Sequence, residues 1–157
     1  MKGVPLMALW DQLKARVADM SAQTKTQVGK FKSKEFANAS MAMCALIAAA
    51  DGNVDAEEKR KTGAFIQSND VLSVFDASEL LEKFNWYASK LQSDYEFGKV
   101  EAIATIGKLR SKPDQARAVI QVGIIIGGAD GNFDKDEQQA VREACNAVGI
   151  SPAEFDL

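Results

Sequence analysis

Two short acidic segments hold the side chains best suited to chemistry in this chain of 157 residues. They are residues 50–58 (ADGNVDAEE) and 129–137 (ADGNFDKDE), which lie 79 positions apart, and seven of the nine aligned positions agree in residue or charge type. Carboxylate and amide oxygens are the ligands that calcium and magnesium prefer. The sequence therefore predicts a divalent-cation site of calcium or magnesium type, with the candidate ligands Asp51, Asn53, Asp55, Glu57, Glu58, Asp130, Asn132, Asp134, Asp136 and Glu137.

The Asp-x-Asn-x-Asp spacing matches the first three ligand positions of an EF-hand loop, where alternate side chains of a turning loop converge on one ion. The match then ends. The sixth position is Ala56 or Lys135 instead of glycine, and the twelfth is Thr62 or Val141 instead of glutamate. The pattern thus excludes a complete EF-hand and leaves a shorter oxygen site, closed by the last glutamate of each segment.

A second interpretation of the same residues needs no ligand. Glycine supplies the left-handed conformation that ends a helix, and an acidic residue followed three positions later by glutamate forms a capping box that starts the next one. In this interpretation the segments only join two helices, through Gly52 and Gly131 as terminators, Val54 and Phe133 as buried anchors, and Asp55, Glu58, Asp134 and Glu137 as caps.

The elements that position these segments are predicted to be helices, because apolar residues recur every three or four positions along most of the chain. We expect an all-α fold, a compact bundle of about seven helices with two pseudo-symmetric helix–acidic turn–helix halves. The almost uncharged stretch 36–50 is predicted to be central. A connector is expected at 68–76, and the remaining helices over 55–67, 77–91, 96–108, 113–128 and 134–148. The aromatic residues Phe84, Trp86 and Tyr87 are expected to serve packing.

Composition narrows the classes of function. The formal net charge is −3 and the sequence pI about 5.1, which argues against a general nucleic-acid binder. The absence of histidine removes the commonest general base and the imidazole ligand. Cys44 and Cys145 lie in apolar helical patterns and are expected to be buried and reduced. No apolar run is long enough to span a membrane, and the first apolar stretch is too short for a secretory signal, so a cytoplasmic protein is expected.

Charge is unevenly distributed, since residues 1–35 sum to +4 and the remainder to −7. Residues 1–27 form a predicted amphipathic leader, ahead of a helical domain at 28–157. The apolar stripe of the leader has two interpretations, a helix on a membrane surface or a segment that packs on the protein's own core. The stripe consists of Leu6, Leu9, Trp10, Leu13, Val17 and Met20.

The paired Asp-Gly-x-apolar-x-x-x-Glu elements at 51–58 and 130–137 resemble those of the TerB tellurite-resistance family, within the wider group of DjlA-like helical domains. The stretches VGKFKSKEFANASMAMCALIAAADG and AVREACNAVGISPAEFDL are also similar to that family. The resemblance implies a non-catalytic stress-response role associated with metal chelation, and partners among the other Ter proteins, including the membrane protein TerC. The family's acidic positions carry over to Asp51, Asp55, Glu57, Glu58, Asp130, Asp134, Asp136 and Glu137.

The expected function is therefore a non-enzymatic, acidic, cation-binding scaffold that works with other Ter proteins. One alternative is an adaptor that docks a protein partner at the inner face of the membrane without any metal. The other is a metal-dependent hydrolase, which paired carboxylates would permit, but the acidic segments lack a histidine, an adjacent nucleophile and a glycine-rich phosphate loop.

Overall fold

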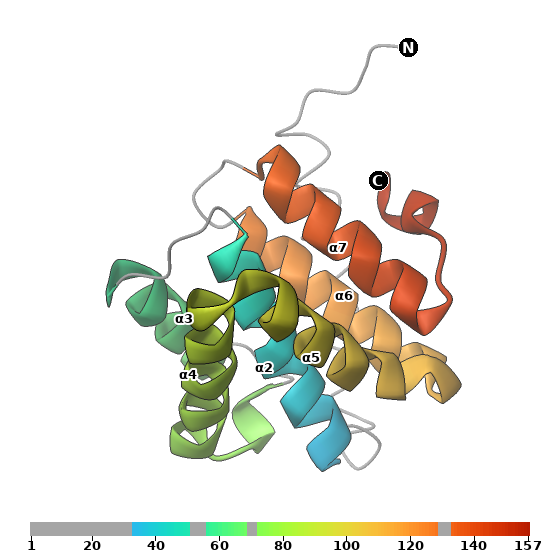
Figure 1. The fold of residues 1–157 in the computed structure, drawn as a ribbon. Helices are drawn as coiled ribbons and strands as arrows, with labels where there is room; N and C mark the ends of the chain where they lie inside the picture. The colour runs from blue at the N-terminus through green and yellow to red at the C-terminus, as the bar shows by residue number, and fades with distance from the viewer. Residues whose placement is uncertain (1–32, 51–55, 69–71, 129–132) are drawn as a thin grey trace.

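The computed structural model describes residues 33–50, 56–68, 72–128 and 133–157, and in these ranges every regular element is a helix. This confirms the predicted all-α class (Figure 1). The predicted leader, residues 1–27, lies outside the described residues. The α-helices are α2 (Lys34–Ala49), α3 (Ala56–Ser68), α4 (Ala77–Ser93), α5 (Tyr95–Gly107), α6 (Pro113–Gly127) and α7 (Lys135–Val148), and the short 3-10 helices are η2 (Leu72–Val74), η3 (Lys108–Ser111) and η4 (Pro152–Phe155).

Helix α2 is the centre of the bundle, as its sequence predicts. It contacts α4, α5, α6 and α7, and 12 of its 16 residues are buried. The helix begins at Ser33, whose hydroxyl oxygen accepts a hydrogen bond of 3.2 Å from the backbone N–H of Phe36. Beyond Glu35 it carries no charged residue, so packing on every side leaves no charge unpaired.

Helices α4 and α5 form an antiparallel pair joined by a single residue. Asp94 ends α4, and its side chain accepts a hydrogen bond from the backbone N–H of Phe97 in the first turn of α5. The Tyr87 and Thr105 hydroxyls lie 2.7 Å apart across the pair. This hairpin covers one side of α2 (Figure 1).

Helices α2 and α6 lie side by side and run in the same direction. At their beginnings, the Lys112 ammonium lies 2.7 Å from a carboxylate oxygen of Glu35. Further along, glycine at position 123 admits the side chain of Met43, because a Cβ there would lie 2.8 Å from Met43 Cγ. The two helices therefore end at the same end of the bundle (Figure 1).

Helix α7 closes the bundle against α5, α6 and α2, and its C-terminus matches the sequence prediction. Gly149 has a left-handed conformation (φ 73°), and the next N–H, of Ile150, donates to the carbonyl of Cys145. This is the hydrogen-bond pattern of a Schellman end, which satisfies the last carbonyls of a helix.

The helix limits expected from the sequence agree with the structure to within about two residues, and the Asp76 side chain caps the start of α4. Phe84 and Tyr87 are buried packing residues, as expected. Trp86 packs edge-on against Tyr87, with ring centroids 4.9 Å apart, but is 47% exposed because it lies off the stripe of α4 that faces the core. The predicted symmetry of the two halves stays a prediction.

Candidate functional site

Half of the ten predicted ligands lie outside the described residues: Asp51, Asn53, Asp55, Asp130 and Asn132. Four others, Glu57, Asp134, Asp136 and Glu137, are described, and Glu58 is described as part of helix α3. The helices on either side of the acidic segments can therefore be compared directly.

The ends of α2 and α6 position the two acidic segments. Ile47, in the last turn of α2, lies against Gly127, the last residue of α6, since a Cβ on Gly127 would lie 3.5 Å from Ile47 Cγ2. Residues 51 and 130 follow these ends by two or three positions in the chain, and one residue spans at most about 3.6 Å. The described helices α2 and α6 thus end side by side, and the chain continues from each end into an acidic segment.

The two helix ends share an electrostatic property. The last four carbonyls of a helix lack intrahelical partners and give its C-terminus a partial negative charge. Neither α2 nor α6 has a basic residue in its last turn. The helices therefore add negative potential at the end from which the acidic segments continue.

In the second copy, the predicted capping box is confirmed. The Asp134 carboxylate accepts a hydrogen bond of 2.9 Å from the backbone N–H of Glu137, and the Glu137 carboxylate accepts one of 3.0 Å from the backbone N–H of Asp134. These bonds satisfy two N–H groups at the start of α7. A carboxylate has more than one acceptor position, so capping alone does not exclude a cation at these residues.

Phe133 anchors the second copy, also as predicted. It is 6% exposed, and a Cβ on Gly127 would lie 2.8 Å from two of its ring carbons. The Gln138 side chain donates a hydrogen bond of 2.7 Å to the Phe133 carbonyl. The close approach of ring and helix therefore depends on glycine at position 127.

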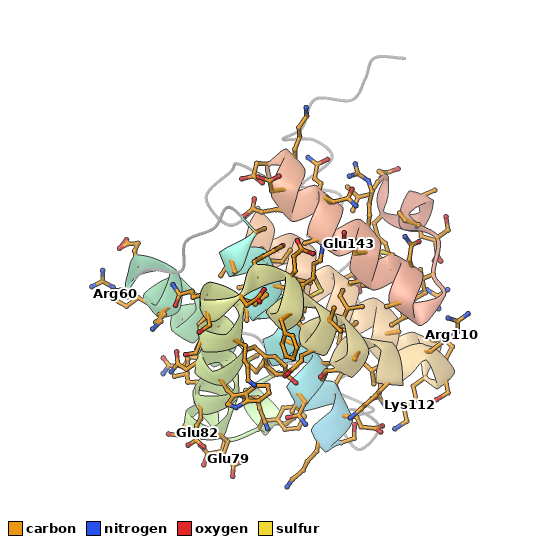
Figure 2. All side chains as sticks on the ribbon, in the orientation of Figure 1. Arg60, Glu79, Glu82, Arg110, Lys112 and Glu143 are labelled. Carbon is orange, nitrogen blue, oxygen red and sulfur yellow. The ribbon has the colours of Figure 1, made fainter. Side chains whose placement is uncertain are left out.

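In the first copy, the described part begins at α3. The Glu57 carboxylate lies 2.9 Å from the Arg60 guanidinium, and both side chains are well exposed. Figure 2 shows Arg60 projecting from α3 at the edge of the molecule. Glu57 is thus a surface residue whose nearest described charge partner lies on its own helix.

The repeat extends into the burial pattern of the two following helices. A shift of 79 positions places Thr62 on Val141 and Ile66 on Cys145. All four side chains are at most 1% exposed. The two copies therefore direct equivalent positions of α3 and α7 toward the interior.

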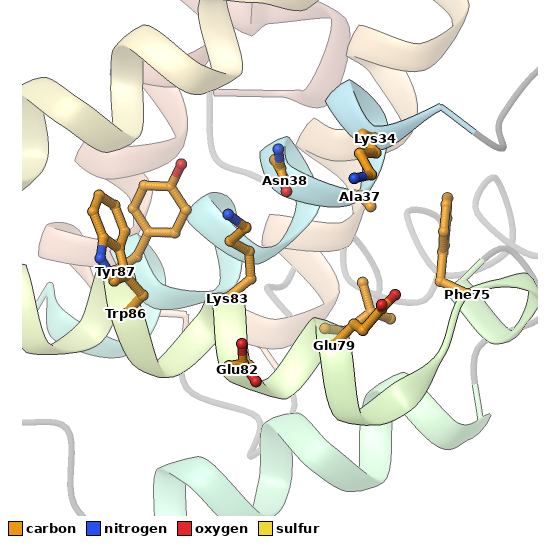
Figure 3. A pocket seen from close by; sticks show the side chains of 10 residues that line it. Lys34, Ala37, Asn38, Phe75, Glu79, Glu82, Lys83, Trp86 and Tyr87 are labelled. Carbon is orange, nitrogen blue, oxygen red and sulfur yellow. The ribbon is translucent and has the colours of Figure 1, made fainter.

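A groove between α2 and α4 was not foreseen from the sequence. It has a volume of about 700 Å³ and opens beside the exposed Trp86. Figure 3 shows Phe75 and Trp86 at opposite ends of it, with Lys83 between them. The available signal was the position of Trp86 between the buried residues Phe84 and Tyr87, which turns it away from the core stripe.

Other chemistry is limited in the part of the chain that the structure describes. Cys44 and Cys145 are free and buried, and burial raises the pKa of each thiol to about 12. Thiols with such a pKa are inert at neutral pH.

Among the described residues, no three histidine, cysteine, aspartate or glutamate side chains gather as a metal site. No helix in the same part of the chain is long and apolar enough to cross a membrane.

These features define an all-helical protein in which two similar acidic segments of the sequence follow α2 and α6, and comparison with known proteins identifies the family. The model of the family "Tellurite resistance protein TerB" matches residues 37–157. The chain is also 36% identical over 118 residues to the "Tellurium resistance protein TerB" of Alcaligenes sp, which covers 75% of this chain and 97% of that relative. No solved structure matches the chain. The protein belongs to the TerB family, as the acidic repeat predicts.

Proposed function

We propose that this chain is a non-enzymatic tellurite-resistance and stress-response protein of the TerB type, whose acidic end binds a divalent cation and docks other Ter proteins. The observation that supports the proposal most strongly is the parallel packing of α2 and α6. Their C-terminal ends lie together, neither last turn has a basic residue, and each end continues into an acidic segment.

The electrostatics of this end favour a cation. Carboxylates kept near one another repel unless a positive charge neutralises them, and the partial charges of two helix C-termini increase that repulsion. A hard divalent ion relieves it through oxygen ligands. The capping box at Asp134 and Glu137 stabilises the start of α7 and thereby supports the outer part of such a site.

The same electrostatics disfavour direct binding of tellurium oxyanions. An oxyanion approaching this end of the bundle meets negative potential. We therefore assign the protein an indirect role in tellurite resistance, in which a bound cation or a basic partner surface links it to other Ter proteins. The membrane protein TerC is the partner that would bring it to the cytoplasmic face of the membrane.

A two-dimensional NMR titration tests the cation site. Calcium, then magnesium, manganese and zinc, are added to the full-length protein, with the amides of Gly52, Asn53, Gly131 and Asn132 as reporters. We expect saturable shifts confined to the acidic segments, lost in the Asp51→Asn/Asp130→Asn variant. The matched control is Glu79→Gln/Glu82→Gln, which removes two exposed acidic charges on α4 (Figure 2) and should leave the titration unchanged.

The absence of shifts at millimolar ion would remove the cation from the proposal and leave docking alone. Docking is then tested by the salt dependence of binding to a TerC-type partner. Binding through the acidic end should weaken as salt rises, and should weaken further in the Asp51→Asn/Asp130→Asn variant. Turnover of a phosphodiester substrate that Asp130→Ala abolishes would contradict the non-enzymatic assignment.

A further inference from the structure

The groove between α2 and α4 has both apolar and charged lining residues and is separate from the acidic end. Its walls come from the first turns of α2, from Phe75 and from the exposed side of α4, including Trp86 (Figure 3). Large apolar side chains that stay half exposed along a groove mark a binding surface more often than isolated ones do. The groove is therefore a candidate for an apolar occupant.

The groove carries a balanced set of charges in addition to its aromatic ends. Glu79 and Glu82 line it from α4, and Lys83 and Lys34 provide the opposite charge. An occupant with both basic and acidic residues beside an apolar stripe would complement this lining. A purely acidic or purely basic ligand would meet repulsion from one pair of these residues.

The leader of this chain has those properties. Its apolar stripe includes Leu9, Trp10 and Leu13, with Lys14 and Asp11 beside it. The family model begins at residue 37, so residues 1–27 lie outside the matched part of the chain.

The connection to the groove is direct. Lys34, the first residue of α2, itself lines the groove, and residues 21–33 join it to the apolar stripe of the leader. Thirteen residues span up to about 45 Å, which exceeds the length of about 25 Å expected for a 17-residue helix such as α4. A tether of this kind gives its attached segment a local concentration in the millimolar range, so even weak contacts fill the groove.

We propose that residues 6–20 of the leader dock, apolar side inward, in the groove between α2 and α4 of the same chain. Docking covers Trp86 and Phe75 with the apolar stripe of the leader. It also keeps that stripe from membranes and from other copies of the chain. The surface is separate from the acidic end, so this proposal does not depend on the cation site.

Paramagnetic relaxation in the full-length protein tests the docking. A spin label is attached at Asp11→Cys, where Cys44 and Cys145 do not compete because their buried thiols remain protonated. We expect broadening of the Asn38 and Lys83 amides in the groove. The amide of Arg142, on α7, should stay sharp.

Two variants separate docking from accidental proximity. Leu9→Asp/Leu13→Asp in the leader and Trp86→Ala in the groove should each remove the broadening at Asn38 and Lys83. Asn85→Ala, an exposed position of α4 that does not line the groove, is the matched control and should preserve it. Broadening that is absent from the groove, or that survives the two disruptive variants, overturns the proposal.

A mixture of labelled and unlabelled molecules identifies the source of the leader. Spin-labelled protein without ¹⁵N is mixed with ¹⁵N-enriched protein that carries no spin label. Broadening of the groove in this mixture at the strength seen within one molecule assigns the leader to a second copy and overturns the proposal. The leader is assigned to membranes if it binds phosphatidylglycerol vesicles and if the groove amides show no broadening in solution without vesicles. This outcome also overturns the proposal.

Discussion

Helices α3 and α7 follow the two copies of the acidic segment and meet the rest of the bundle through different surfaces. Among the described side chains of α3, Thr62 and Ile66 are buried, and the main contacts of the helix are with α4 and η2. Helix α7 buries five residues and contacts α2, α5 and α6 as well as both 3-10 helices near its end. The same repeat thus produces a helix with few contacts on one side and a helix with more extensive packing on the other.

An ion pair between α5 and α7 has no described counterpart on α3. The Lys99 ammonium of α5 lies 3.5 Å from a carboxylate oxygen of Glu143 on α7 (Glu143 is labelled in Figure 2). Partial burial by itself lowers the pKa of Lys99, but the attraction of Glu143 and Glu96 raises it overall. Local opening free energies follow the number of buried contacts, so we expect α3 to open more readily than α7.

Removal of one aromatic ring from each copy should give the largest difference in the free energy of unfolding. Phe133→Ala removes a buried ring next to α6 and should lower the free energy of unfolding by about 3–4 kcal/mol. Phe65→Ala on α3 removes a partly buried ring and should cost about 1–2 kcal/mol. Urea unfolding measures both, and equal losses would contradict the difference in packing.

Replacement of Gly127 and of Gly63 by alanine should change the free energy of unfolding in opposite directions. At Gly127 the new Cβ lies 2.8 Å from the Phe133 ring, and crowding should cost about 1–2 kcal/mol. At Gly63 on α3 the nearest atom, of Leu81, lies 3.7 Å away, so the better helix propensity of alanine should stabilise by up to about 1 kcal/mol. Thermal unfolding of the two variants measures the signs, and a stabilising Gly127→Ala would show that α6 and Phe133 are not closely packed.

The capping box provides a smaller test of the second copy. Asp134→Ala should cost about 1 kcal/mol, because a backbone N–H at the start of α7 loses its acceptor. Asp134→Asn keeps a side-chain oxygen at the same place and is the control. Urea midpoints compare the two variants, and equal destabilisation by both would attribute the effect to charge instead of capping.

The ion pair between Glu35 and Lys112, which joins the beginnings of α2 and α6, should have the smallest effect. The hydrogen bond from Lys112, together with its charge, lowers the pKa of Glu35 below its ordinary value of 4.5. The pair therefore stabilises the fold above that pH, and its contribution is lost as the pH falls through the lowered pKa. Unfolding of Glu35→Gln and of the unaltered protein from pH 6 to pH 3 should converge at the acidic end. A difference in the free energy of unfolding that grows toward pH 3 would contradict the predicted pH dependence.

The sequence was sufficient to predict the helices and part of the candidate site. The helices follow from the spacing of apolar residues. The capping box at Asp134 depends on local hydrogen bonds, which a few neighbouring residues determine. The parallel course of α2 and α6 depends on contacts between residues 80 positions apart, such as Met43 and Gly123, which no local pattern reveals.

The exposure of Trp86 was missed although a local signal was present. The spacing of Leu80, Phe84, Tyr87 and Leu91 forms the buried stripe of α4, and Trp86 lies outside it. The unequal packing of α3 and α7 is a tertiary property, since the repeat makes the two helices alike in pattern.

Native-state hydrogen exchange of α3 and α7, without and with calcium, tests the central claim that the two copies differ in stability and that a cation joins them. Without calcium, the amides of α3 should exchange through openings of lower free energy than those of α7. Saturating calcium should slow exchange in α3, since an ion that binds only the closed acidic end stabilises it by mass action. Equal opening free energies in both helices, unchanged by calcium, would contradict the account.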